Sequence, residues 1–543
     1  MTNKTPEKNA GWAVIAMLAA AQFIMVLDTT VMNVSITQVA ADLNTTVVGL
    51  QTAITLYTLV MAAFMLLGGK LGDRWGARRA YMVGLLIYGA GSLTTALSPN
   101  LGVLLVGWSF IEGFGAVLVI PAIAALTAAT YSGQQRALAY GILGGVSGAS
   151  AALGPLIGGW VTANYTWRLV FAGETVVVLA LMLFLSKIPA TAGRQGKLDL
   201  TGVVLSAAGL GMAVFGILRS SQWGWIAPSA SAPFTPLGLS PVFWLIAVGL
   251  VLLGLFARHE RALLAAQKEP MLDVRLLEIP PMRAGLTTYL CQQFIIMGIF
   301  FVLPLYLQTV LGFDALETGI ALLPLSLSLL VFALAGARLA GRHSPQRIAL
   351  AGLLSMLIGI ILLIAFTSAD LRTAGFALAL AMVGAGNGLL VSQLGNVIMS
   401  SVTPERGSEA GGLQGTAMNL GASLGVALVG SILIASLVSS FQKQVLTDPT
   451  LAALAPQLTA QAEQNANFVS VEQVAVAAES AGLSPEEVAA VTENYAEAQI
   501  IALKVAFAAV ALFALLALWY VQSLPKRAEG AKLADGPPAV AAG

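Results

Sequence analysis

Long apolar stretches recur along the whole chain, and they constrain its fold more than any other feature. A helix that crosses the roughly 30 Å hydrocarbon layer of a bilayer needs about 20 mostly apolar residues. Fourteen segments meet this requirement: 11–36, 47–69, 80–98, 101–130, 138–162, 169–188, 201–219, 241–257, 284–310, 317–337, 347–366, 373–400, 411–438 and 499–521. Because continuous apolar runs dominate over strand-like alternation, we predict an all-α integral membrane protein with 14 transmembrane helices.

Composition agrees with a chain that is mostly embedded in lipid. Hydrophobic residues make up 57% of it and charged residues 10%, against roughly 25% charged in soluble proteins. The net charge of +1 excludes a nucleic-acid binder that works through bulk charge. The single cysteine, Cys291, excludes a disulfide framework and a thiolate metal site. We therefore expect the lipid bilayer as a partner, with no nucleic acid and no metal.

The distribution of basic residues predicts how the spans are oriented, because loops rich in Lys and Arg stay in the cytoplasm. With fourteen spans and a cytoplasmic N-terminus, 22 basic residues fall on the cytoplasmic side and five at or near the outer side. The five are Arg168, Arg219, Arg372, Lys443 and Lys504. We therefore expect a multi-pass protein of the cell (inner) membrane with both termini in the cytoplasm.

The order of the spans predicts two six-helix bundles with an inserted helix pair. The bundles cover 11–188 and 284–521, and the pair covers 201–257. The other segments are a cytoplasmic N-tail (1–10), a cytoplasmic linker (258–283), an extracellular loop (439–498) and a cytoplasmic tail (522–543). A degenerate repeat of the stretch 69–79 occurs at 337–347. Such internal duplication is typical of secondary transporters, whose substrate site lies between the halves.

The segment 439–498 is the most extensive polar region, with eight acidic residues and one base, Lys443. Within it, Ser484-Pro485-Glu486-Glu487 predicts a helix start, because serine caps helices, proline suits the first turn and a glutamate three residues on reaches back. We expect a short helical hairpin outside the membrane. Its acidity either concentrates cations at the pore mouth or is that of an ordinary solvated surface.

Short motifs in both halves carry a family resemblance. The loop 69–79 holds Gly69, Leu71, Asp73, Arg74, Gly76 and Arg78 at signature positions. Leu27-Asp28-Thr29-Thr30-Val31-Met32-Asn33-Val34, Gly154-Pro155-Leu156-Ile157-Gly158-Gly159, Trp167-Arg168 with Phe171, and Leu303-Pro304-Leu305-Tyr306-Leu307-Gln308 are the further motifs. Together they resemble the major facilitator superfamily, specifically its fourteen-helix drug–proton antiporter branch. In that branch, the first loop is a gate and the Gly-Pro element of helix 5 is the antiporter signature.

The resemblance implies an antiporter driven by the proton gradient, without a cofactor, in which helices 1 and 4 line a central cavity. The chain departs from the family in helix 4, where Ser109 replaces the usual arginine and Glu112 stands where a glutamine is common. In helix 6, Glu174 replaces the frequent asparagine. Since the arginine is credited in relatives with a part in proton coupling, the geometry of coupling in this chain stays open.

Three acidic residues lie well inside predicted spans: Asp28, Glu112 and Glu174. Such groups cost about 2.5–3.5 kcal/mol to insert and usually mark an ion or substrate path. From the helical rise, Asp28 and Glu112 lie ~12 and ~17 Å below the outer ends of their helices. Desolvation and mutual repulsion favour their protonated forms, so a proton and a lipophilic cation are expected to compete for them.

Other roles stay open for these acids. Glu174 is the third candidate for coupling, but its helix is peripheral in the resembled fold, and a packing or interfacial role fits it better. Asp28 or Glu112 alternatively only hydrogen-bonds a neighbouring helix, for example at Asn33 or Ser109. These alternatives differ in one testable respect, because only coupling requires the groups to exchange protons.

The motif residues also admit two interpretations each. Asp73 and the basic residues around it form either a gating latch that acts on a helix dipole of the other half or a charged turn that obeys the positive-inside rule. Gly154, Gly158 and Gly159 permit close helix approach, and Pro155 removes one helix hydrogen bond. The kink at this proline either blocks proton leak, as in the antiporters it resembles, or only packs helices.

Helices expected at the cavity carry aromatic, methionine and amide side chains, which suit flat apolar cations. The candidates for substrate contact are Phe23, Met25, Met32, Asn33, Trp108, Phe110, Phe114, Tyr289, Gln293, Phe294, Met297 and Asn387. Each of them alternatively faces lipid or packs between helices. The substrate itself is not specified by any of these residue types.

Enzyme motifs fail on inspection. Gly421-Ala422-Ser423-Leu424-Gly425 matches the serine-hydrolase elbow but lies inside a predicted span, and no phosphate-binding loop ends in Gly-Lys-Ser/Thr. We therefore expect a secondary active transporter that uses no ATP. The leading hypothesis is proton-coupled export of hydrophobic, often cationic, drugs or toxicants by alternating access. The alternatives are a dedicated exporter of one metabolite, antibiotic or lipid, and a transport-inactive membrane sensor.

Overall fold

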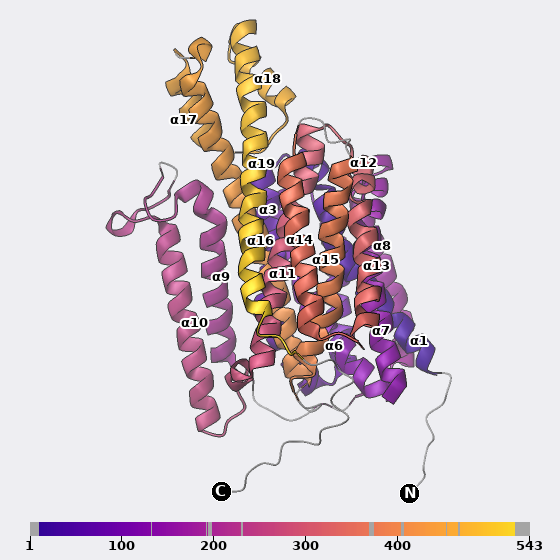
Figure 1. Ribbon diagram of the computed structural model, residues 1–543. Coiled ribbons are helices and arrows are strands. Elements are labelled where there is room, and N and C mark those ends of the chain that lie inside the picture. The colour runs from indigo at the N-terminus through magenta and orange to yellow at the C-terminus, as the bar shows by residue number, and fades with distance from the viewer. Residues whose placement is uncertain are drawn as a thin grey trace, which may run out of the picture.

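The computed structural model describes residues 10–526, apart from 132, 192, 194–197, 230–231, 341, 369–373, 403–406, 452 and 465–466. All regular elements in these ranges are helices. Figure 1 shows an upright bundle; its lower end is where α1 begins and α19 ends, and its upper end is where α17 and α18 project. The predicted N-tail 1–10 and cytoplasmic tail 522–543 fall largely outside the described residues.

The first half of the bundle is built from the N-terminal elements. They are α1 (Ala10–Val34), α2 (Ile36–Asp42), α3 (Val47–Trp75), α4 (Ala77–Ala96), α5 (Leu101–Leu104), the π-helical η1 (Leu105–Glu112), α6 (Gly113–Thr130), α7 (Gly133–Asn164), α8 (Arg168–Leu183) and the short η2 (Leu185–Lys187). Side-chain caps set two of the helix starts: Thr46 accepts from the Gly49 backbone N–H and Asn100 from that of Val103. The predicted single span 101–130 consists of α5, η1 and α6 in succession, so it is an α–π–α helix.

The inserted pair stands at one side of the bundle (Figure 1). It comprises α9 (Leu200–Trp223) and α10 (Pro241–Ala265), with the short η3 (Pro236–Gly238) between them and η4 (Val274–Glu278) after them. Helix α9 packs on α3 and α16, whereas α10 packs mainly on α9. Only 17% of the most apolar window of α10 is buried. The remaining apolar surface of this helix is suited to contact with lipid.

The second half contains the C-terminal elements. They are α11 (Pro280–Leu305), the π-helical η5 (Tyr306–Val310), α12 (Ala315–Ala321), α13 (Leu323–Leu339), α14 (Pro345–Phe366), α15 (Ala374–Met399), α16 (Gly407–Thr447), η7 (Pro449–Leu451), α17 (Ala455–Gln464), α18 (Val471–Ser480) and α19 (Pro485–Val521). The helix start predicted at Ser484 is confirmed, with a capping box between Ser484 and Glu487. The segment 439–498 is more than a short hairpin, because α16 and α19 both extend into it.

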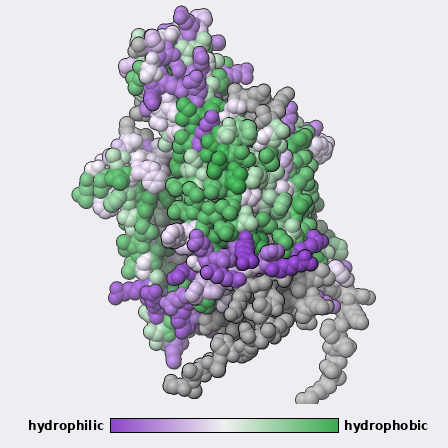
Figure 2. Space-filling model, in the orientation of Figure 1, coloured by the Kyte–Doolittle hydropathy of each residue, from purple (hydrophilic) through white to green (hydrophobic). Residues whose placement is uncertain are grey.

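Ten helices among the described residues are long and apolar enough to cross a membrane, or up to twelve if two bent pairs each count as one span. Helix α8, with 16 residues, and α4, which begins with two arginines, are not among the ten. Figure 2 shows a broad apolar surface over the bundle, hydrophilic residues in a band below it, and a hydrophilic projection at the top. This distribution is that of a chain embedded in a bilayer.

Candidate functional site

Three carboxyl groups from three different elements meet inside the first half of the bundle. Asp28 comes from α1, Glu112 from η1 and Glu174 from α8. One oxygen of each lies within 4.8 Å of the corresponding oxygens of the other two. The exposed fractions of the three residues are 0%, 0% and 2%. We call these three residues the carboxylate triad.

Aromatic and hydroxyl groups supply the hydrogen bonds of the triad. The indole N–H of Trp108 donates to both oxygens of Asp28, with nitrogen–oxygen distances of 2.8 and 3.0 Å. Tyr88 and Ser92 donate from their hydroxyls to Oε2 of Glu174 at 3.3 and 3.2 Å. Neither oxygen of Glu112 has a hydrogen-bond partner. A buried carboxyl without partners cannot persist as an anion, so the triad holds at least one proton when it is closed off from water.

Glycines bring the backbones of η1 and α6 against α4 and so position the triad. A side chain at Gly91 would place its Cβ 2.5 Å from the backbone nitrogen of Glu112, and one at Gly115 would lie 2.4 Å from the backbone nitrogen of Tyr88. Only glycine permits backbones this close. The π-helical geometry of Leu105–Glu112 is of a kind that occurs frequently at functional sites. Ser109, in place of the usual arginine, donates to the Ala53 carbonyl of α3 at 2.8 Å.

Glu174, for which a packing or interfacial role was favoured because its helix is peripheral in the resembled fold, lies with the other two acids. Helix α8 packs on α4, and the side chain of Glu174 reaches between α4 and η1 to the other two acids. The rise along a helix gives the depth of a residue but not the direction of its side chain. Tyr88 and Ser92, four residues apart on one face of α4, are the partners that the sequence analysis did not single out.

The stretch 69–79, predicted as a gating loop, is mostly helical: α3 runs to Trp75 and α4 begins at Ala77, so Gly76 alone forms the turn between them. Gly76 has a φ of +85°, and a Cβ there would lie 2.2 Å from the Thr191 carbonyl oxygen, so this position requires glycine. The backbone N–H of Arg78 donates to the Thr191 hydroxyl at 3.2 Å. Gly69 is buried, Arg74 is exposed, and Asp73 lines a hollow at this end. The turn is thus fixed to the segment that leads toward the inserted pair.

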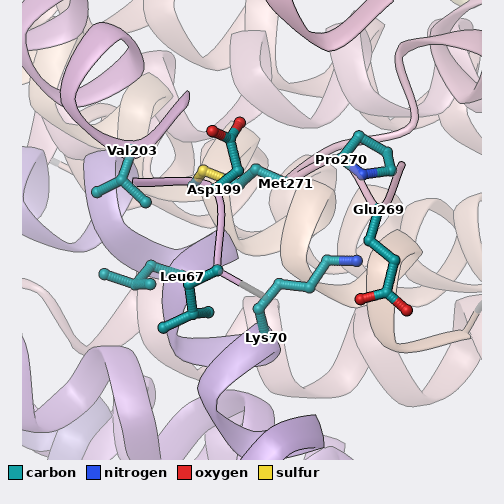
Figure 3. Close-up of a pocket in the computed structure, with 8 residues that line it drawn as sticks. Leu67, Lys70, Asp199, Val203, Glu269, Pro270 and Met271 are labelled. Atoms are coloured by element: carbon teal, nitrogen blue, oxygen red, sulfur yellow. The ribbon is translucent and has the colours of Figure 1, made fainter. Parts of the chain in front are cut away.

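Lys70, in the last turns of α3, forms an ion pair with the other half and lines a hollow beside the inserted pair and the linker. Its ammonium group lies 3.4 Å from Oε1 of Glu409 on α16, which links the two halves. Figure 3 shows Lys70 in a hollow that Asp199 lines from the start of the inserted pair and Glu269 and Met271 line from the linker. Sequence reasoning missed this ion pair, because only the fold brings residues 70 and 409 together.

The glycines of the antiporter signature permit close packing of α7 on both halves. At Gly154 an added Cβ would meet the side chain of Thr30, and at Gly158 that of Val31, both on α1. At Gly159 it would lie 2.3 Å from the Ala315 carbonyl oxygen of α12. On the α12 side, a Cβ at Gly319 would lie 2.4 Å from the carbonyl oxygen of Pro155. The packing interpretation of this motif therefore has direct geometric support.

A second contact between the halves lies at the upper end. The side-chain amide of Gln308 in η5 donates to the Val34 carbonyl at the end of α1, at 2.5 Å, and its oxygen accepts from the hydroxyl of Thr37. The sequence analysis quoted Gln308 only as a motif residue. Because its partners belong to the other half, this amide holds the two halves together at the end opposite to Lys70 and Glu409.

Most of the residues predicted to contact substrate are buried in packing. Trp108 donates a hydrogen bond to Asp28, and Asn387 accepts one from the side-chain amide of Gln292. The ring of Phe294 stacks on that of Phe513, with centroids 3.7 Å apart. Met25, Met32, Asn33 and Tyr289 are also buried. Phe23, Phe114, Gln293 and Met297 are partly exposed, and Phe110 is exposed. The structure thus brings the three acids together. The residues predicted to contact substrate do not form one pocket.

Comparison with known proteins agrees with this architecture. The family model described as the Major Facilitator Superfamily matches residues 18–426. A bacterial homologue of the human lysosomal transporter Spinster, in an inward-facing and unoccupied conformation, superposes with a TM-score of 0.59 at 16% identity and covers 95% of this chain and 98% of its own. The chain therefore belongs to the major facilitator superfamily.

Curated relatives narrow the class further. The puromycin resistance protein of Streptomyces alboniger is 30% identical over 79% of this chain and 82% of its own. The tetracenomycin C resistance and export protein of Streptomyces glaucescens is 28% identical over 85% and 82%, and the multidrug efflux pump LfrA of Mycolicibacterium smegmatis is 26% identical over 80% and 82%. The chain is thus a multi-pass transporter of the cell membrane, in the drug-efflux branch of its superfamily.

Proposed function

We propose that this protein is a proton-coupled antiporter that exports hydrophobic, often cationic, compounds by alternating access. The observation that carries the proposal is the carboxylate triad, which collects three acids in one buried site. Ionised groups in a medium of low dielectric repel one another strongly, so the closed triad retains protons. When the site opens to water, it releases them or exchanges them for a cation.

The proposal includes a topology. Fourteen spans form two six-helix bundles and an inserted pair, and the lower end in Figure 1 faces the cytoplasm. Supporting this, the adjoining ends of α3 and α4 carry Arg74, Arg78 and Arg79 at that end. The ion pair of Lys70 with Glu409 and the amide contact of Gln308 then act as contacts at the inner and outer gates. Alternating access requires that these two contacts open in turn.

A closed triad sets a condition on this mechanism. Since none of the three acids is more than 2% exposed, protons reach them only after a rearrangement. Opening of a gate therefore precedes proton exchange in each cycle. Separate opening to each side is also what prevents a proton leak.

A second candidate is a dedicated exporter of one antibiotic on the same fold. It is favoured by the relatives whose names state one compound, such as the cephamycin export protein of Amycolatopsis lactamdurans. Competition between chemically unrelated dyes for one transport activity separates the two candidates, because a dedicated exporter shows none.

The deciding experiment measures proton release when candidate cations are added to the purified protein. We expect release by the native protein and loss in Asp28→Asn/Glu112→Gln, with Asp448→Asn as the control. Asp448 lies outside the triad, in the polar segment 439–498, and accepts from the side-chain amide of Asn494 at 2.7 Å. Release that persists in the double variant contradicts the proposal. Absence of any substrate-dependent proton flux in proteoliposomes of the native protein would favour the membrane sensor.

A further inference from the structure

The three acids of the triad differ in the donors that face them. Both oxygens of Asp28 accept from the indole N–H of Trp108. One oxygen of Glu174 accepts from two hydroxyls, and its other oxygen is buried without a partner. Both oxygens of Glu112 are buried without a partner. The stabilisation of a negative charge therefore decreases from Asp28 through Glu174 to Glu112.

The chemistry of these donors supports the same order of charge stabilisation. An indole N–H donates and never accepts, whereas a hydroxyl does either. Tyr88 and Ser92 therefore suit Glu174 in both its charged and its neutral form. Trp108, shared between two oxygens of one carboxyl, suits Asp28 best when both oxygens are acceptors, which is the ionised form.

Trp108 is itself held in place by packing. Its ring stacks on Tyr57 of α3, with centroids 4.8 Å apart and an interplanar angle of 8°, and none of its surface is exposed. The titratable groups around Glu112 are Asp28 from α1, Glu174 from α8, Tyr88 from α4 and, beyond Asp28, Tyr57 from α3. No cation stands among these groups, so a proton is the charge that neutralises Glu112.

We propose that Trp108 is a positioning residue that keeps Asp28 ionised, so that Glu112 carries the exchanged proton. This inference rests on the proposed proton-coupled function and assigns the proton within it. In the step itself, the O–H bond of the Glu112 carboxyl breaks on opening, and the proton passes to water while the carboxylate remains. A substrate cation then meets a site with two negative charges, at Asp28 and Glu112. In the return step Glu112 takes a proton from water.

The test is the pH dependence of substrate-induced proton release in Trp108→Phe. This variant keeps an aromatic ring for Tyr57 to stack on and removes the N–H donor together with part of the indole, a loss of ring volume that the control variant reproduces. We expect the pH midpoint of release to rise by about one unit, a tenfold change in proton affinity, because Asp28 then also binds a proton. The matched control is Trp167→Phe, which removes an indole N–H from Asp42 at 3.0 Å, outside the triad, and leaves the midpoint unchanged.

Two single variants test the assignment without altering Trp108. Glu112→Gln is expected to lose proton release and the infrared C=O stretching band of a protonated carboxyl that disappears when substrate is added. Asp28→Asn is expected to keep the band and to release protons only at higher substrate concentration, because one charge of the cation site is gone, and its pH midpoint should be lower because Glu112 has lost a negative neighbour. The opposite pattern, with release lost only in Asp28→Asn, overturns the proposal, as does an unchanged midpoint in Trp108→Phe. If the native protein releases no protons, it is the proposed function that fails.

Discussion

Buried acids occur in two regions of this molecule, and their surroundings differ. The triad lies inside the first half of the bundle, whereas the buried Glu260 and the partly buried Asp199 lie at the lower junction between the inserted pair and its linker. Glu260 is 0% exposed, as are Asp28 and Glu112. Burial alone therefore does not distinguish the two regions, and the difference is found in the donors.

At the junction, donors from the backbone and a histidine stand against the acids. Asp199 caps α9 by accepting from the backbone N–H of Gly202 at 3.0 Å, and it lies 3.0 Å from Nε2 of His259. Oε2 of Glu260 accepts from the backbone N–H of Leu272 at 3.1 Å. These bonds tie together the start of α9, the end of α10 and the linker. We interpret the junction acids as structural.

Electrostatics at Asp199 agrees with this interpretation. Burial raises the pKa of its carboxyl, but the Gly202 N–H and His259 outweigh burial and hold the pKa below its usual range. The folded state therefore favours the charge of this acid. In the triad, by contrast, neither oxygen of Glu112 accepts a hydrogen bond, and the nearby hydroxyls of Tyr88 and Ser92 donate to Glu174 instead. At the junction, Oδ2 of Asp199 and Oε1 of Glu260 are also buried without a partner. The contrast is therefore that each junction acid accepts at least one backbone hydrogen bond, which fixes the local structure, whereas Glu112 accepts none.

The largest expected effect is a functional difference between the two regions. In Asp28→Asn/Glu112→Gln, gradient-driven transport should fall by two orders of magnitude or more, while thermal stability stays or rises, because the change removes the need to bury charge. In Asp199→Asn/Glu260→Gln, transport per folded molecule should persist. Transport assays in proteoliposomes, normalised to folded protein, measure both. A loss of coupling in the junction variant alone would reverse the comparison.

A smaller effect is expected on stability at the junction. Asp199→Ala removes the N-cap of α9 and the partner of His259, and loss of such a cap costs about 0.5–2 kcal/mol. We expect a lower melting temperature and an unchanged pH profile of proton release. Asp314→Ala is the control, since Asp314 caps α12 in the same way without a histidine. An equal loss in both variants would mean that His259 adds nothing.

The charge of Asp199 also predicts how stability depends on pH. A carboxyl whose pKa is lowered by folding stabilises the protein above its unfolded pKa, about 3.9 for aspartate, and this contribution is lost as pH falls through the folded pKa. Asp199→Asn keeps the cap and removes the charge. The native protein should therefore melt higher than this variant at pH 7, and the difference should vanish in strong acid. A difference that is the same at both pH values would show that the charge has no role.

The sequence was sufficient to find the acids and the long helices. Asp28, Glu112 and Glu174 stand out because charged groups in apolar spans are costly, whatever the fold. Their convergence was not predictable, because it depends on rotation of α8 about its axis and on the π-helical segment Leu105–Glu112. No local pattern in the sequence marks that segment.

The ends of the helices were also only partly predictable from the sequence. An apolar run gives the length of a span in the membrane, but α16 and α19 continue past it into the polar segment 439–498. Their continuation reflects helix-forming residues and the capping box at Ser484. Conversely, the substrate candidates were chosen by residue type, and type does not reveal whether Trp108 or Phe294 faces a cavity or another side chain.

The smallest expected effect concerns the ion pair that joins the halves at the lower end. The side chains of Lys70 and Glu409 are 27% and 26% exposed, and such pairs contribute about 0.2–1 kcal/mol. Lys70→Ala should therefore shift the balance between open and closed states of this end by about 1.4- to 5-fold. Distances between spin labels across the lower end measure that balance, in a background where Cys291, the one native cysteine, is replaced. Added salt should produce the same shift in the native protein and little change in the variant, whereas an equal response to salt in both would show that the pair does not hold the gate.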